Sequence, residues 1–153
     1  MIYYEDCEVG EFRRFGSCVV TREETIEFAT RFDPQPFHLD DDAAAATHFG
    51  RLSASGWHTA AMTMRMWVDD MAREKRASLG SPGIDKLRWL KPVFPGDVLS
   101  AETELLEKRR SRSRPEMGIL STRMATFNQS GDKVLEMYSA GLIAVRDPAA
   151  PID

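Results

Sequence analysis

The segment Asp33-Pro34-Gln35-Pro36-Phe37-His38 carries a carboxylate and an imidazole on a stretch of chain that two prolines stiffen. Each proline fixes its own φ and disfavours helix at the residue before it, so the segment is expected to run as a bent, extended loop. Such a bend can turn Asp33 and His38 toward one point. Because a carboxylate and an imidazole that face one small molecule can move protons, these two residues are the candidate catalytic pair.

Capped helices are predicted on both sides of this loop. A capping box begins at Thr21, and apolar residues recur at helical spacing as far as Phe32. After the loop, Asp40 is placed to cap a second short helix, which is expected to run from Asp41 to about Phe49. The two helices would hold the loop at both ends.

A longer helix is predicted to begin at Gly56 and to end near Arg76. No proline or further glycine interrupts this stretch, and its apolar residues recur at helical spacing. Ser55 is placed as the N-cap, which leaves the first backbone N–H groups of the helix unpaired at its amino end. Such an end stabilises developing negative charge, so Ser55, Gly56 and Trp57 are the candidate oxyanion and substrate-binding residues.

The second half of the chain changes from helical spacing to the pattern of strands. Including one earlier strand, the predicted strands are residues 11–20, 84–89, 98–106, 118–127 and 134–145. Turns of hairpin length between them indicate an antiparallel sheet, and the long amphipathic helix is available to cover one of its faces. The expected fold class is α+β, with an antiparallel sheet wrapped around a long central helix.

Composition restricts the classes of function. A chain of 153 residues is one domain of ordinary size, and a net charge of -4 argues against general binding of nucleic acid. No apolar run is long enough to span a membrane, and the amino terminus does not read as a signal peptide. Cys7 and Cys18 form no metal-ligand spacing with the three histidines, so we expect no metal, reduced thiols and a cytoplasmic location.

The order of these motifs resembles the MaoC-like dehydratases, which include the R-specific enoyl-CoA hydratases of the hot-dog fold. The resemblance covers residues 21–99 with motifs, namely Asp33-x-x-Pro36-x-His38-x-Asp40, Phe49-Gly50, Ser55-Gly56, Leu87-Arg88-Trp89-Leu90-Lys91-Pro92-Val93 and Pro95-Gly96-Asp97. It implies a single hot-dog domain over residues 1–147, and the composition of residues 148–153, rich in Pro and Ala, predicts a flexible tail. It also implies a homodimer or a higher homo-oligomer.

The activity that the resemblance implies is reversible addition of water across the 2,3 double bond of an acyl thioester, carried by coenzyme A or by an acyl carrier protein. No separate cofactor is expected, because coenzyme A is part of the substrate. By the same resemblance, Asp33 would be the general base toward water, and His38 would orient that water and help to deliver a proton to Cα. The N–H of Gly56 would bind the enolate-like oxygen.

Two positions depart from what many members of the family carry. Gln35 stands where many have Asn, and it keeps the amide with a longer reach. Ser55 stands where many have His, which either changes the wall beside the thioester or serves only as the helix cap. The acyl chain, its carrier and the pathway cannot be read from the sequence.

Other functions and other roles stay open. A hot-dog thioesterase would use a carboxylate on or near the long helix, but Asp69 and Asp70, its first acids, come several turns from the amino end. A non-catalytic acyl-binding or regulatory module would require the Asp33 and His38 pair to be broken, and it is intact. His48 and His58 are left outside the catalytic set.

Two further clusters of residues each allow a structural interpretation and a substrate-binding one. Met62, Met64, Met66 and Met71 are expected to fill the core, although flexible methionines would also suit an acyl tunnel. The run from Lys108 to Arg114 holds five cations. It is expected to be the solvated end of a hairpin, and the alternative is a contact with the phosphates of coenzyme A.

Overall fold

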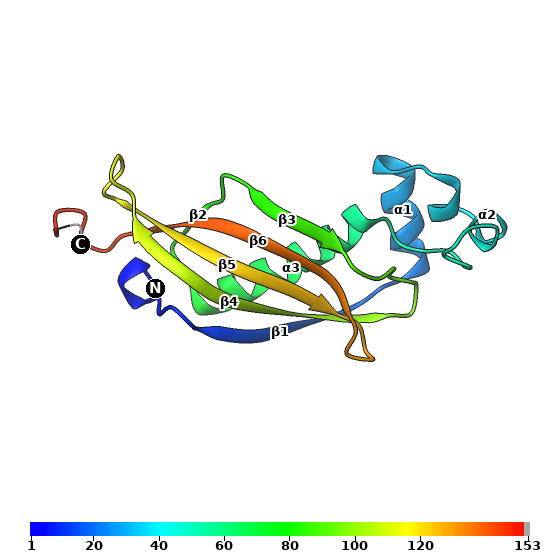
Figure 1. Cartoon of the computed structure of the whole chain (residues 1–153), viewed down its shortest axis with the longest axis horizontal. Coiled ribbons are helices and arrows are strands. Elements are labelled where there is room, and N and C mark those ends of the chain that lie inside the picture. Colours follow the sequence, from blue (N-terminus) through cyan, green and yellow to red (C-terminus); the bar gives the residue numbers. More distant parts are fainter. Residues whose placement is uncertain (152–153) are drawn as a thin grey trace.

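The computed structural model describes residues 1–151 and shows a six-stranded antiparallel sheet curled around one long helix, α3 (Figure 1). The α+β fold class predicted from the sequence is confirmed. The elements in chain order are η1 (Tyr4–Asp6), β1 (Phe12–Val19), α1 (Arg22–Phe32), η2 (Pro36–His38), α2 (Asp41–Ala45), α3 (Gly56–Glu74), β2 (Ser78–Gly80), β3 (Ile84–Trp89), β4 (Val98–Arg110), β5 (Met117–Phe127) and β6 (Lys133–Ala144).

The strand order of the sheet is β1-β4-β5-β6-β2, and β3 also pairs with β6. Every one of these pairs is antiparallel. β2 and β3 therefore lie one after the other along the same side of β6, and together they form the edge of the sheet opposite β1. This edge and α3 carry several exposed apolar side chains, namely Trp57, Met64, Val68, Leu79, Ile84 and Trp89.

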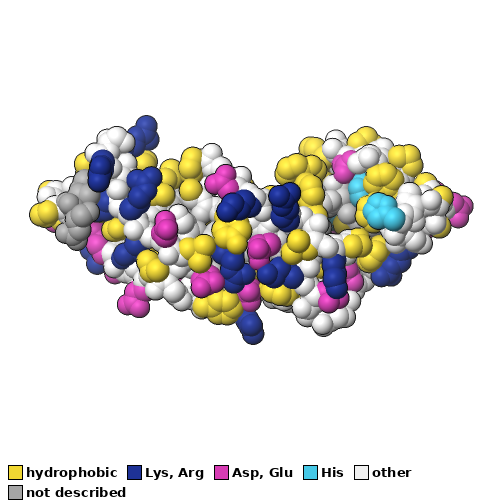
Figure 2. Space-filling view, viewed as in Figure 1, with side chains coloured by type: hydrophobic (Ala, Val, Ile, Leu, Met, Phe, Trp, Pro, Cys, Tyr) yellow, Lys and Arg dark blue, Asp and Glu magenta, His cyan; other side chains and the backbone are white. Residues whose placement is uncertain are grey.

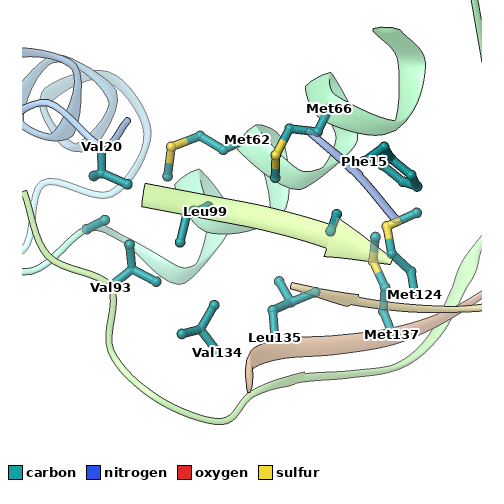
Figure 3. Packing of buried hydrophobic residues seen from close by; sticks show 12 residues of the cluster. Phe15, Val20, Met62, Met66, Val93, Leu99, Met124, Val134, Leu135 and Met137 are labelled. Atoms are coloured by element: carbon teal, nitrogen blue, oxygen red, sulfur yellow. The ribbon is translucent and has the colours of Figure 1, made fainter. Parts of the chain in front are cut away.

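The core lies between the inner face of the sheet and the first turns of α3. Met62 and Met66 point from α3 toward a set of buried side chains on the strands (Figure 3), namely Phe15, Leu99, Met124, Leu135 and Met137. At Gly16, whose φ is +81°, an added Cβ would overlap the side chain of Met66. The glycine thus lets β1 approach the helix closely. The core role predicted for the methionines holds for these two.

Helices α1 and α2, with the loop that joins them, project beyond one end of the sheet (Figure 1). We call residues 21–50 the overhang. Its two predicted caps are present, since Thr21 accepts from the N–H of Glu24 at 3.2 Å and Asp40 accepts from the N–H of Ala43 at 2.8 Å. These caps fix where α1 and α2 begin, and so they fix the ends of the loop between them.

Helix α2 is shorter than predicted, because it ends at Ala45 rather than near Phe49. The hydroxyl of Thr47 donates to the carbonyl of Ala44 at 2.8 Å and accepts from the N–H of Phe49 at 3.2 Å. A side chain that takes over backbone partners in this way replaces helix with turn.

Strand β4 is longer than predicted and continues to Arg110. Its last residues pair with β5 in register from Lys108 opposite Leu120 to Arg110 opposite Gly118. Two of its cations bind backbone carbonyls: Lys108 donates to the carbonyl of Cys7 at 2.6 Å, and Arg110 donates to carbonyls of residues 115, 148, 150 and 151. Part of the predicted tail thus lies against Arg110, and its last two residues lie outside the described part of the chain.

Candidate active site

Asp33 and His38 meet at the base of the overhang. Asp33 follows the last turn of α1, where its N–H donates to the carbonyl of Ala29 at 2.9 Å. The chain then leaves the helix at Pro34 and turns back through η2, in which His38 is the last residue. This turn places Nε2 of His38 3.5 Å from Oδ2 of Asp33. The bend expected from the two prolines brings the candidate pair together.

The imidazole of His38 has a defined orientation. The residue is only 5% exposed, and its Nδ1 lies 2.7 Å from the backbone carbonyl of Ser53. Since a carbonyl can only accept, Nδ1 carries a proton, and the ring turns Nε2 toward Asp33. The rings of Phe37 and Phe49 pack beside the imidazole, with centroids at 4.6 and 6.0 Å. The carbonyl of Ser53 and the two phenyl rings therefore hold the imidazole in one orientation.

Two side chains donate hydrogen bonds to the carboxylate of Asp33. The hydroxyl of Ser55 donates to Oδ2 at 2.7 Å, and the amide of Gln35 donates to Oδ1 at 2.8 Å. Burial raises the pKa of Asp33, but these two donors and the nearby His38 outweigh it and hold the pKa below its ordinary value. Asp33 is thus an ionised acceptor that still has a lone pair toward His38.

Ser55 also joins this pair to the amino end of α3. Its hydroxyl oxygen accepts from the N–H of Trp57 at 3.3 Å, which makes Ser55 the N-cap, as predicted. The N–H of Gly56, in the first position of the helix, has no acceptor within the helix. The carboxylate of Asp33 and the amino end of α3 are thereby fixed to one another through a single hydroxyl.

Trp89 of β3 covers Gly56. Its indole N–H donates to the carbonyl of Gly56 at 2.7 Å, and a Cβ at position 56 would lie 2.6 Å from atom Cδ2 of the indole ring. The ring of Trp57, which is 59% exposed, meets that of Trp89 edge-on with centroids 5.1 Å apart. Only glycine fits at position 56 without moving Trp89, and this requirement is one of space, since φ here is not positive.

Sequence reasoning missed two contributors to this geometry. Ser53 acts through its backbone carbonyl, for which a side-chain pattern gives no signal. Trp89 belongs to a segment that the resemblance singled out, but its contact with Gly56 spans 33 positions of sequence and comes from the pairing of β3 with β6. A contact of that kind depends on the assembled fold.

His48 and His58 take no part in the contacts of Asp33 and His38 in the described chain. His48 lies in the turn after α2, against the ring of Phe49. His58 is 7% exposed and stacks on Phe28 of α1 with ring centroids 4.8 Å apart. Its Nδ1 is buried without a hydrogen-bond partner, and burial lowers the pKa of the ring.

A cavity of about 290 Å³ lies along the second half of α3, between that helix and the sheet. Met64 and Met71 contribute to its walls, so these two methionines do not fill the core. The cavity ends at an ion-pair network in which Arg13 binds Asp70 at 2.9 Å and Glu74 also contacts Arg13. Asp33, His38 and Gly56 do not line it.

The curled antiparallel sheet around one long helix defines a hot-dog fold. The family described as the MaoC like domain matches residues 8–126, and the chain belongs to this family of hydro-lyases.

Similar proteins include solved and curated members. A MaoC-like dehydratase from Rhodospirillum rubrum is 38% identical, with a TM-score of 0.86, and the match covers 96% of this chain and 99% of that one. YdeM, an uncharacterized protein of Bacillus subtilis, is 30% identical over 86% of this chain and 92% of its own length. A mesaconyl-CoA hydratase from Cereibacter sphaeroides is 41% identical over 84 residues, which are 55% of this chain and 23% of that protein.

Within residues 1–151, no helix is both long and apolar enough to cross a membrane. Over the same residues, no cluster of three or more His, Cys, Asp or Glu side chains is arranged to hold a metal ion.

Proposed function

We propose that this protein adds water to, and removes water from, the 2,3 double bond of an acyl thioester. The observation that carries the proposal is the position of Oδ2 of Asp33 and Nε2 of His38, 3.5 Å apart beside the amino end of α3. Both atoms can accept a hydrogen bond when the imidazole is neutral. That separation is long for a direct hydrogen bond. One water molecule can donate a hydrogen to each acceptor, and its oxygen lone pairs then stay free to attack carbon.

Asp33 and His38 would have different roles in the reaction. Because its pKa is lowered, Asp33 is a weak proton acceptor, so we assign the proton of the water to Nε2 of His38. Asp33 therefore orients and polarises the water, and its charge stabilises the imidazolium that forms when Nε2 of His38 takes the proton. This assignment moves part of the base role that the resemblance gave to Asp33 onto His38.

The hydration step can be written with all atoms in balance. An O–H bond of water breaks as its proton passes to Nε2 of His38, and the oxygen bonds to Cβ of the thioester. The electrons of the double bond move onto the thioester carbonyl oxygen, where the N–H of Gly56 stabilises the charge. Nε2 then returns the proton to Cα, which restores the neutral imidazole and the carbonyl.

Membership of a hydro-lyase family and the similarity to a mesaconyl-CoA hydratase support this chemistry. The contacts of Asp69 and Asp70 disfavour the thioesterase alternative. Arg65 holds Asp69 at 3.0 Å on the exposed side of α3, and Arg13 holds Asp70. Each acid thus has an arginine partner, and the intact Asp33 and His38 pair disfavours a non-catalytic module.

We also propose that the active form is a homodimer joined along β3 and α3. The edge formed by β2 and β3 exposes apolar side chains together with those of α3, and an uncovered edge with apolar surface favours pairing of two copies. Trp57 and Trp89 belong to this surface, so a second copy would also enclose the space beside Gly56.

The test is a direct assay on 2-enoyl-CoA thioesters of several chain lengths, including branched and carboxylated ones. Loss of the conjugated enoyl absorbance reports hydration, and free thiol reports hydrolysis. We expect hydration without thiol release, and we expect Asp33→Asn and His38→Ala each to lower kcat/KM by about 10²–10⁴-fold. Thiol release without hydration, or full turnover by both variants, would overturn the proposal.

A further inference from the structure

The end of the hairpin between β4 and β5 is strongly basic. We call residues 108–114 the basic tip, since five of its seven residues are Lys or Arg and none is acidic. Lys108 and Arg110 donate to backbone carbonyls, but Arg109, Arg112 and Arg114 are exposed and make no ion pair with any residue in the range 1–151. Three cations thus remain available to a ligand.

The overhang, which carries the candidate site, is strongly acidic. The overhang that carries Asp33 and His38 contains seven acidic residues and two arginines between Thr21 and Gly50, a formal charge of -5. One of those arginines, Arg22, is already paired with Asp41 at 2.7 Å. A coenzyme A thioester carries phosphates, which this surface repels, so cations from elsewhere would have to receive them.

The basic tip cannot do this within one chain. It lies at the opposite end of the molecule from α1 and α2 (Figure 1), and dark blue side chains gather at that end (Figure 2). Helix α3 alone, with its 19 residues, separates the two ends by about 28 Å. Any contact between the basic tip and a ligand at Gly56 therefore needs a second copy of the chain.

A two-fold symmetric dimer would bring the basic tip of one copy toward the overhang of the other. The exposed apolar residues lie on both β3 and α3, so both helices must stay on the same side of the joined sheet for these residues to be covered. A two-fold axis perpendicular to the sheet meets that condition, and it makes the two β3 strands and the two α3 helices antiparallel. The basic tip of each copy then approaches the end of the other copy that carries the overhang.

We propose that the basic tip of one copy binds the phosphates of the coenzyme A thioester held in the site of the other copy. This inference rests on the proposed hydratase function and on the proposed dimer. Arg112 and Arg114, in the turn itself, are the principal phosphate ligands, and Arg109 supports them from β4. The acidic overhang is also attracted to the same cations, which favours this arrangement of the dimer.

Binding is measured first, without turnover. Isothermal titration with coenzyme A and with adenosine 3′,5′-bisphosphate compares the wild type with Arg112→Ala/Arg114→Ala. We expect the Kd of both ligands to rise about tenfold in the variant, since two exposed charge contacts of ordinary strength are lost. The matched control, Arg14→Ala/Lys133→Ala, removes two cations from the outer face of the sheet and should leave Kd unchanged. Equal Kd values for wild type and tip variant, or no binding by the wild type, would overturn the inference.

Activity then separates this inference from the proposed function. Each protein is assayed with a 2-enoyl-CoA and with the same acyl group on pantetheine, which lacks the phosphates. We expect the ratio of the two kcat/KM values to fall about tenfold in the Arg112→Ala/Arg114→Ala protein. An unchanged ratio with a normally active wild type contradicts the basic-tip proposal alone, whereas a wild type inactive on both thioesters contradicts the hydratase proposal.

Complementation tests whether the tip acts on the other copy. An Asp33→Asn chain, with an intact tip, is unfolded and refolded together with an Arg112→Ala/Arg114→Ala chain, which has an intact Asp33 and His38 pair. In a mixed dimer, the intact tip of the Asp33→Asn chain faces the intact Asp33 and His38 pair of the other chain. If the tip acts across the interface, that site has both parts, and a fraction of the sites regains the wild-type KM. A mixture in which every active site keeps the raised KM would show that the tip acts within its own chain or not at all.

Discussion

The hydroxyl of Ser55 donates to Oδ2 of Asp33 at 2.7 Å, across 22 positions of sequence. The same oxygen accepts from the N–H of Trp57 and so caps α3. The residue that begins the long helix is therefore also the residue that keeps the carboxylate of the candidate pair ionised and in place. Position 55, where the sequence departs from many relatives, serves both the fold and the site.

Replacing Ser55 with Ala should affect stability and pH dependence separately. Loss of the cap should lower the free energy of unfolding by about 1 kcal/mol. Loss of the donor removes one of the influences that lower the pKa of Asp33, so that pKa should rise toward its ordinary value. In the proposed mechanism the carboxylate acts in its charged form, so activity should be lost at a higher pH on the acid side of the kcat/KM profile.

The two effects of Ser55→Ala are checked by urea unfolding and by a pH profile of kcat/KM on one enoyl thioester. Ser100→Ala, a change at an exposed serine of β4, is the control and should alter neither measurement. An acid limb of Ser55→Ala that coincides with that of the wild type would show that the hydroxyl does not tune Asp33.

Gly56→Ala should disturb the amino end of α3 through Trp89. The new Cβ would lie 2.6 Å from atom Cδ2 of the indole, so either the ring or the helix end must move, at a cost of about 1–3 kcal/mol. Removal of the ring in Trp89→Ala makes room, so Gly56→Ala should cost less in that background. A double-mutant cycle by urea unfolding measures this coupling, and additive losses would contradict the contact.

The sequence predicted the Asp33 and His38 pair because the signal for it is local. Two prolines and two capped helices restrict a short loop, and the structure follows those restrictions. The orientation of His38 depends instead on the carbonyl of Ser53, and the shape of the site depends on Trp89 across the sheet. Neither contact leaves a periodic or compositional trace. Sequence spacing alone therefore gives the candidate pair without the groups that orient it.

The misjudged element ends have a similar cause. The alanines after Asp41 favour helix, but the side chain of Thr47 competes for the backbone groups that would extend α2 past Ala45. In β4 the charged residues after Leu106 suggested a turn, yet cross-strand pairing with β5 extends the strand to Arg110. The side chain of Thr47 thus overrides the helix propensity at the end of α2, and pairing with β5 overrides the turn propensity at the end of β4.

His58 should make the protein less stable in mild acid. Burial lowers the pKa of His58 in the folded state, while in the unfolded chain the ring has its ordinary pKa. Between these two values the unfolded state binds the extra proton, so this contribution to stability falls as pH decreases. The groups known to face the ring are Phe28, which stacks on it, and Glu24, whose charge opposes the shift without cancelling it.

The measurement for His58 is the urea midpoint at pH 7.5 and at pH 5.5. His58→Phe keeps an aromatic ring against Phe28 and removes the titrating group, so the difference between the two midpoints should be smaller than in the wild type. His48→Gln, in the turn after α2, is the control and should retain the wild-type difference. An equal difference in His58→Phe and wild type would contradict the prediction.

Removing only one partner of the ion pair between Arg13 and Asp70 should destabilise the folded protein. Asp70 is 8% exposed and binds the guanidinium of Arg13 through both of its oxygens. Arg13→Met leaves that carboxylate without its partner and should lower the free energy of unfolding by about 2 kcal/mol, less than for a fully buried pair because Arg13 is partly exposed. Adding Asp70→Leu should recover most of the loss in urea unfolding. A double variant less stable than Arg13→Met would contradict this account.

The proposed dimer should depend on the surface of β3 and α3. Ile84 is 39% exposed and Val68 is 45% exposed, and a lysine at either position would place an unpaired charge inside the interface. We expect the wild type to elute from a sizing column and to scatter light as a dimer, and Val68→Lys or Ile84→Lys to shift it to the monomer. Val19→Lys is the control, because Val19 is 57% exposed but lies on β1, the opposite edge of the sheet. A wild type that is monomeric at assay concentration, or charged variants that stay dimeric, would exclude this interface and with it the trans contact of the basic tip.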